Sequence, residues 1–104
     1  MAKSTVQYAS YENEQISLKG DLLFSNIKEA RAQLERELLT LFKASDAPIP
    51  ISLKGVKRVD SSALSLCLCA LRLAKQHQKS VRFIDHPNEL MAIADLVGVT
   101  NTLS

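Results

Sequence analysis

The residues best suited to chemistry are a carboxylate and two hydroxyls in adjacent positions, Asp60, Ser61 and Ser62. They follow a short β-branched and basic segment and precede an apolar run from Leu64 to Ala74. This pattern predicts the first turn of a long helix, where unpaired backbone N–H groups and a partial positive charge favour oxygen atoms and anions. Any of the three residues can act as the N-cap. A serine here can also be a nucleophile if a base lies within reach.

Nucleophilic use of these serines requires a base in hydrogen-bond contact and an acid that orients it. The chain has two histidines. His77 is expected at the far end of the same helix, whereas His86 follows the next strand and could approach Ser61. The sequence contains no Gly-x-Ser-x-Gly elbow, no Gly-rich phosphate loop and no His/Cys/Asp cluster with metal-ligand spacing. We therefore expect no enzyme, and neither a catalytic residue, a bound metal nor a cofactor.

The two cysteines, Cys67 and Cys69, lie two residues apart within the same helical pattern. Two steps of about 100° direct them to nearly opposite sides of a helix, so they can form neither a disulfide nor a shared metal site. Free cysteines usually behave as small apolar residues. We predict that both are core residues.

The helix after Asp60 has two apolar sides, separated only by a narrow polar strip of Ser65 and Arg72. One side comprises Leu64, Cys67, Leu68, Leu71 and Ala74, and the other comprises Leu66, Cys69, Ala70 and Leu73. A helix that is apolar nearly all round is buried by something, and one sheet cannot cover both sides. Either flanking helices or a partner protein must bury the second side. A gap for a partner is most expected at the amino-terminal turns, near Ser61 and Ser62.

The elements that position this helix alternate along the chain after an opening hairpin. We expect two strands at residues 6–11 and 15–19, followed by a turn at Gly20-Asp21 and a helix that Asn26 and Glu29 open as a capping box. A strand from Ile49 to Leu53, closed by Lys54-Gly55, precedes the helix after Asp60. After that helix we expect a strand at residues 81–84, a helix begun by Asp85-His86-Pro87 and ended by Gly98, and a last extended piece at residues 99–103.

This order predicts a single α/β domain over residues 1–104. Its small mixed sheet would combine the amino-terminal hairpin with parallel strands, because right-handed crossovers make the later strands parallel. Three main helices would pack on the sheet. The loops at the carboxyl ends of parallel strands carry function in such folds, and the loops of Asp60 and Asp85 are expected beside each other.

Composition argues against several classes of function. The 104 residues are 46% hydrophobic and carry a net charge of +2, as in an ordinary soluble domain. Because the basic residues are scattered and no Trp is present, we expect no nucleic-acid partner. No secretory signal is seen, and the apolar run at residues 63–74 is too short to span a bilayer. We expect a cytoplasmic protein without direct membrane insertion.

The stretch from Ile51 to Leu64 resembles the signature of STAS domains, a family named for sulphate transporters and anti-sigma factor antagonists. That signature is a strand, a Gly-Val turn, and Asp-Ser-Ser-Gly opening an amphipathic helix. The stretch from Gly20 to Ile27 is similar to the MlaB-type branch of the family, as is the stretch from Arg58 to Leu64 with Arg72. The resemblance covers nearly the whole chain and implies a STAS-like fold.

MlaB-type proteins are small cytoplasmic subunits of an ABC transporter that moves phospholipids and maintains outer-membrane lipid asymmetry. The resemblance implies a non-enzymatic subunit that binds and supports the ATPase of such a transporter, and that lies at the inner membrane through this partner. The resemblance places Ser61 at the protein–protein contact with the ATPase. From their position at the start of the same helix, we expect Asp60, Ser62 and Ser65 to take part in the contact, with apolar neighbours such as Leu64 and Leu66.

By position, Ser61 also matches the residue that a partner kinase phosphorylates in anti-sigma factor antagonists. The alternative function is therefore an antagonist switched by phosphorylation at Ser61, with an anti-sigma factor and a serine kinase as partners. Ala63 stands where many family members have Gly, which places a methyl group where a backbone might otherwise approach. A homodimer through the exposed edge of the sheet remains open.

Overall fold

The computed structural model describes residues 6–96 and Gly98. The elements follow one another as β1 (Ala9–Glu12), β2 (Gln15–Leu22), α1 (Ile27–Ala44), β3 (Ile49–Val59), α2 (Ser61–Gln76), β4 (Val81–Ile84) and α3 (Asn88–Leu96). The strands lie in the spatial order β1-β2-β3-β4, with β1 antiparallel to β2 and the other pairs parallel. The predicted mixed sheet with an opening hairpin is confirmed.

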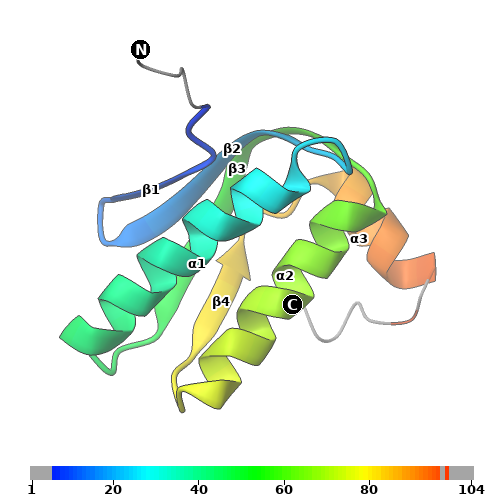
Figure 1. Cartoon of the computed structure of the whole chain (residues 1–104). Helices are drawn as coiled ribbons and strands as arrows, with labels where there is room; N and C mark the ends of the chain where they lie inside the picture. The colour runs from blue at the N-terminus through cyan, green and yellow to red at the C-terminus, as the bar shows by residue number, and fades with distance from the viewer. Residues whose placement is uncertain (1–5, 97, 99–104) are drawn as a thin grey trace.

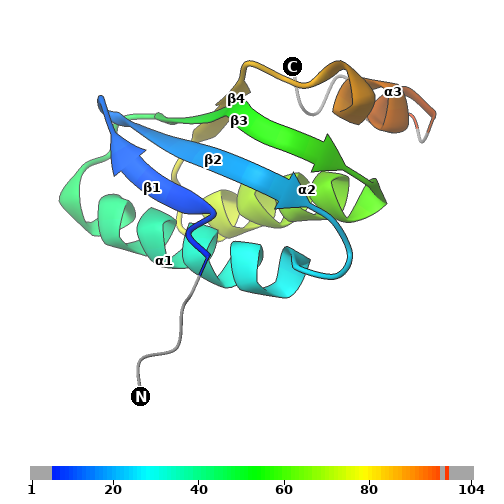
Figure 2. The same cartoon turned by 90° about the horizontal axis from the view of Figure 1, so that it is seen from above.

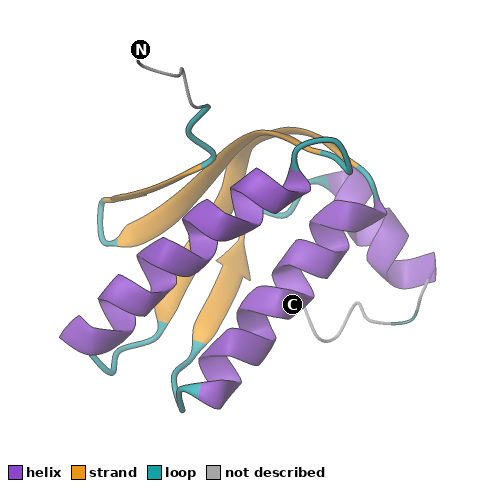
Figure 3. Ribbon diagram, viewed as in Figure 1, coloured by secondary structure: helices purple, strands orange, loops and turns teal. Residues whose placement is uncertain are grey.

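Two long helices form a layer on one face of the sheet. Figures 1 and 2 show α1 and α2 side by side on this face, and Figure 3 shows both in front of the strands. The core between the layers contains Ile16, Leu18, Ile51, Leu53 and Phe83 from the strands and Ala30, Leu34, Leu38 and Phe42 from α1. The four α1 residues recur at intervals of four, so they form one apolar face of the helix, and this face meets the sheet.

Helices, rather than a partner, bury most of the second apolar side of α2. This helix contacts both α1 and α3. Figure 1 shows α3 behind the amino-terminal half of α2, and Figure 2 shows α3 near the carboxyl end of β3, on the other side of the strands from α1 and α2. Its buried residues are Ala63, Leu64, Leu66, Cys67, Ala70 and Ala74. Ser61, Ser65 and Arg72 remain exposed.

Neither Gly20 nor Gly55 ends its strand, so the turn predicted at Gly20-Asp21 and the stop at Lys54-Gly55 are wrong. Gly20 lies within β2 at φ +86°. Gly55 lies opposite Lys19, where an added Cβ would be 2.9 Å from the Lys19 Cβ and 3.1 Å from the Leu18 carbonyl oxygen. Gly55 therefore permits close approach of β2 at an irregular part of the ladder. As a result β3 continues to Val59.

The length of β3 separates two loops that were expected together. β4 pairs only with residues Ile49 to Ser52 of β3, so Asp85 follows beside the middle of β3 rather than beside Asp60. There the Ser52 hydroxyl donates to Asp85 Oδ2 at 2.9 Å. The strand register that would have brought His86 beside Ser61 is not formed.

The helix ends confirm some of the predicted caps and correct one. Asn26 precedes α1 but makes no side-chain cap hydrogen bond, and instead its Oδ1 accepts from the Leu23 N–H at 2.9 Å. The capping box is therefore wrong. Gly98, at φ +77°, donates to the Asp95 carbonyl and acts as the predicted end of α3. The extended piece predicted at residues 99–103 lies outside the described residues.

No helix in the described ranges is long and apolar enough to cross a membrane.

Candidate functional site

Asp60 joins the first turn of α2 to the loop between β2 and α1. Its Oδ1 accepts from the Ser62 N–H at 2.8 Å, which makes Asp60 the N-cap of α2. Its Oδ2 accepts from the Phe24 N–H at 2.9 Å. Both carboxylate oxygens are thus occupied by backbone donors. Asp60 therefore holds the loop of Phe24 against the first turn of α2.

The hydrogen bonds to Asp60 make its contribution to folding depend on pH. The Phe24 N–H, and to a lesser extent the Ser62 N–H, lower the Asp60 pKa, while desolvation acts in the opposite direction. A carboxylate whose pKa is lower in the folded state stabilises it above the unfolded-state pKa, and this contribution is lost as pH falls through the folded-state pKa.

Asp60→Ala should lower the thermal unfolding midpoint by several degrees at neutral pH, because it removes the cap and the tie to Phe24. The difference from the wild type should shrink once the pH falls below the folded-state pKa of Asp60. Thermal melts of both proteins across this pH range measure the effect. Asp60→Asn, which keeps one acceptor oxygen, should be intermediate. A gap that does not change with pH would contradict the role of the carboxylate charge.

Five of the residues expected at the partner contact do not share one degree of exposure. Ser61 and Ser65 are exposed, and Asp60 and Ser62 are half-buried. Leu66 is only 2% exposed. Because α1 packs against this side of α2, the Leu66 side chain belongs to the core and cannot protrude toward a partner.

A hollow of about 270 Å³ lies between the β2–α1 loop and the first turns of α1 and α2. It is lined by Phe24, Ile27, Lys28, Arg31, Ser62, Ser65, Leu66 and Cys69. Leu66 contributes to its wall although little of its side chain is exposed. The hollow is mostly apolar, and it contains two of the predicted serines.

Phe24 is the residue that the sequence reasoning missed. Its side chain is 83% exposed beside the serines of α2. Strand alternation gave no signal for this exposure, because it puts Phe24 on the same face as the buried Leu22. In the structure β2 ends at Leu22, and Phe24 lies in the loop that follows. A large exposed apolar side chain next to an apolar hollow is typical of an interaction site.

The two cysteines differ in their surroundings. Cys67 is fully buried, and burial raises the pKa of its thiol to about 12. Its prediction as a core residue is confirmed. Cys69 is half-buried and lines the hollow, so that prediction holds only in part. In the described part of the chain, no three His, Cys, Asp or Glu side chains are grouped so as to hold a metal ion.

A family model described as "Mlab, STAS domain" matches residues 6–104. The chain belongs to the STAS domain family. Members of this family are protein-interaction modules. In the STAS domain described here, the segment from β3 through Asp60-Ser61-Ser62 into α2 is the part that carried the resemblance in the sequence.

Comparison with solved structures supports the fold. A structure described as "Crystal Structure Analysis of Mglu" matches 78% of the STAS domain with a TM-score of 0.54 and 17% sequence identity. The match covers 20% of that protein's chain. At this identity the likeness concerns the fold alone. No curated protein matches the chain.

Proposed function

We propose that this STAS domain is a non-enzymatic subunit that binds the ATPase of a phospholipid-transport ABC transporter and supports its activity. It would lie in the cytoplasm, at the inner membrane through that partner. The observation that carries the proposal is the surface at the start of α2, where the exposed Phe24 and Ser65 line one hollow and the exposed Ser61 is the first residue of the helix. We call Phe24, Ser61, Ser62 and Ser65, with the hollow that Phe24, Ser62 and Ser65 line, the docking surface.

The chemistry of the docking surface suits a protein partner. Protein interfaces concentrate their binding energy in a few anchors, often aromatic, surrounded by near-neutral contacts that exclude water. Phe24 supplies such an anchor, and the serine hydroxyls can donate and accept hydrogen bonds around it. Asp60 fixes the loop of Phe24 to the first turn of α2. The surface is therefore organised before any partner arrives, which reduces the entropic cost of binding.

The exposure of Ser61 at the first position of α2 also supports a second candidate, an anti-sigma factor antagonist switched by phosphorylation. A phosphate on Ser61 would add about −1.5 to −2 charges. The helix amino terminus would stabilise it by about 0.3–1 kcal/mol, opposed by the neighbouring Asp60 carboxylate. The fold would survive, while the docking surface would become locally negative. A local change of charge of this kind alters which partner surface is electrostatically complementary.

Affinity capture combined with intact-mass measurement separates the two candidates. The tagged STAS domain is expressed in its native cell, captured and weighed. We expect the ABC ATPase to co-purify in a stoichiometric complex, with the STAS domain at its unmodified mass. A stable species heavier by about 80 Da, the mass of one phosphate, without an ABC subunit would instead support the anti-sigma antagonist.

Ser61→Asp tests whether the hydroxyl lies at the contact. We expect the ATPase affinity to fall by about tenfold, because the new carboxylate must be desolvated at the interface. Ser80→Asp is the matched control, since Ser80 is exposed between α2 and β4, at the other end of α2. Binding of the ATPase to both variants with wild-type affinity would place the contact elsewhere.

A further inference from the structure

β1 is an edge strand with backbone groups directed away from the sheet. The Lys19 N–H donates to the Tyr8 carbonyl at 2.9 Å, which directs that carbonyl toward β2, whereas the Tyr8 N–H donates to Gln33. Ala9 and Tyr11, one and three residues later, pair with Leu18 and Ile16. Because successive residues of an antiparallel strand alternate between facing the partner strand and facing away, the N–H and C=O groups of Ala9 and Tyr11 face outward. An edge of this kind is a template on which another chain can pair.

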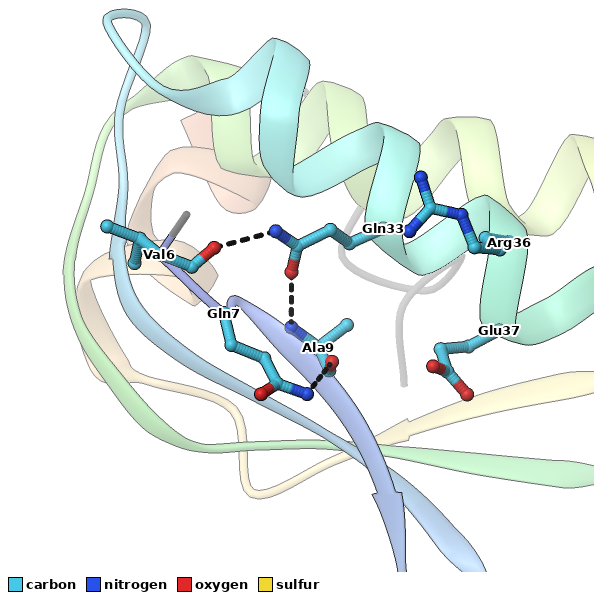
Figure 4. Close-up of a pocket in the computed structure, with 6 residues that line it drawn as sticks. All are labelled: Val6, Gln7, Ala9, Gln33, Arg36 and Glu37. Atoms are coloured by element: carbon cyan, nitrogen blue, oxygen red, sulfur yellow. Dashed lines mark hydrogen bonds between the residues drawn. The ribbon is translucent and has the colours of Figure 1, made fainter. Parts of the chain in front are cut away.

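A side chain of α1 occupies this edge at its amino-terminal end. Gln33 Oε1 accepts from the N–H groups of Tyr8 and Ala9 at 2.6 and 3.2 Å, and Gln33 Nε2 donates to the Val6 carbonyl at 2.7 Å. Gln7 Nε2 donates to the Ala9 carbonyl at 3.2 Å. Figure 4 shows the Gln33 amide between Val6 and Ala9, with the Gln7 amide on the other Ala9 group.

The Gln33 amide has a planar donor and acceptor, as a backbone peptide group has. It therefore makes the hydrogen bonds that a neighbouring strand would make, and together with Gln7 it satisfies both outward groups of Ala9. Gln33 also lines a second hollow, beside β1, together with Arg36 and Glu37 of α1. The amino-terminal end of this edge, at residues 6–9, is thus covered by side chains of the chain itself.

We propose that Gln33 is a protective cap on β1, which prevents a second copy of this chain from extending the sheet through residues 6–9. The occupant that it excludes is a second β1 strand, because two identical edges related by a two-fold axis pair antiparallel. The cap lies at residues 6–9, away from the docking surface at the start of α2. It prevents self-pairing at this end of β1 while α2 remains free to bind a partner.

Amide hydrogen exchange of the wild-type protein, followed by NMR, tests the cap without any substitution. The amides of Ala9 and Tyr11 both face outward, but only that of Ala9 donates to Gln33. We expect Ala9 to exchange measurably more slowly than Tyr11. Equal exchange of the two amides would overturn the proposal, as would a wild-type dimer paired through β1.

Gln33→Ala tests the consequence for self-association, with Arg36→Ala as the control on the same face of α1. Light scattering should give a mass of 11.5 kDa for the wild type and the control, and a mass rising toward twice that value with concentration for Gln33→Ala. A Gln33→Ala protein that loses protection at Ala9 but stays monomeric would overturn the proposal. Gln33→Glu keeps the acceptor oxygen and should remain monomeric with Ala9 protected, so dimerisation of this variant would also contradict the cap. If Gln33→Ala does not fold, the proposal is tested by the exchange rates of Ala9 and Tyr11 in the wild type and by the mass of Gln33→Glu.

Discussion

Phe24→Asp is expected to abolish measurable ATPase binding while the STAS domain stays folded. The Phe24 side chain is 83% exposed, so its removal takes little from the core. Truncation of an aromatic anchor at an interface typically costs about 2–4 kcal/mol, which is roughly 30-fold to 1000-fold in Kd. The introduced carboxylate adds the cost of burying an unpaired charge. Titration of the purified ATPase with each protein, by calorimetry, measures the change.

Tyr11 provides the matched control for Phe24. It is an aromatic residue that is 48% exposed, and it lies on β1 beside the carboxyl-terminal end of α1 rather than beside the first turn of α2. Tyr11→Asp should leave the affinity within about twofold, the range of neutral contacts. Equal losses in the two variants would show a general effect of added charge. Wild-type affinity in Phe24→Asp would remove Phe24 from the interface.

Leu66→Arg is expected to unfold the domain. Leu66 is 2% exposed between α1 and α2. Truncation of a buried leucine costs about 2–5 kcal/mol, and an unpaired buried charge costs several kcal/mol more. A domain of this size has a total stability of about 5–15 kcal/mol. Urea denaturation should therefore show a largely unfolded protein or a midpoint far below that of the wild type.

Ser65→Arg is the control for this substitution, because it places the same side chain one residue earlier at an exposed position of α2. Its unfolding free energy should stay within about 0.5 kcal/mol of the wild type. If Leu66→Arg were as stable as Ser65→Arg, the packing of α1 on α2 would be wrong. A loss of binding in Leu66→Arg reports unfolding, so that variant cannot test the docking surface.

The parts of the fold that follow from local rules were predictable. The hairpin needs only a two-residue turn, and Asn13 and Glu14 adopt the positive φ values of 53° and 62° that such turns use. The start of α2 needs a capping residue before an apolar run, and Asp60 provides it. Both signals are contained within a few consecutive residues, so they can be read without knowing which distant segments pack against them.

The two strand glycines show where local reading fails. A glycine beside a strand pattern can end the strand or can lie within it at a bulge or a close backbone approach. The role of Gly55 is set by Lys19, which lies opposite it on β2. Its meaning therefore depends on a register that the sequence does not display. The displaced loop of Asp85 follows from the same error, because β3 was predicted too short.

The serines of the candidate site could be predicted from the sequence, but the exposure of Phe24 and the burial of Leu66 could not. Ser61 and Ser65 follow from the helical wheel of α2, but the exposure of Phe24 depends on the Asp60 carboxylate that holds its loop. The burial of Leu66 depends on how α1 packs on α2. Both are tertiary effects. They move the candidate anchor of the interface from Leu66 to Phe24.

Amide hydrogen exchange of the STAS domain with and without the ABC ATPase tests whether the ATPase binds at the docking surface. We expect the added ATPase to slow exchange in the Phe24–Asn26 loop and in the first turns of α2, residues 61–66. Residues 77–80, at the other end of α2, and the β1–β2 turn should not change. Protection confined to those distant segments, or no protection at saturating ATPase, would contradict the docking surface.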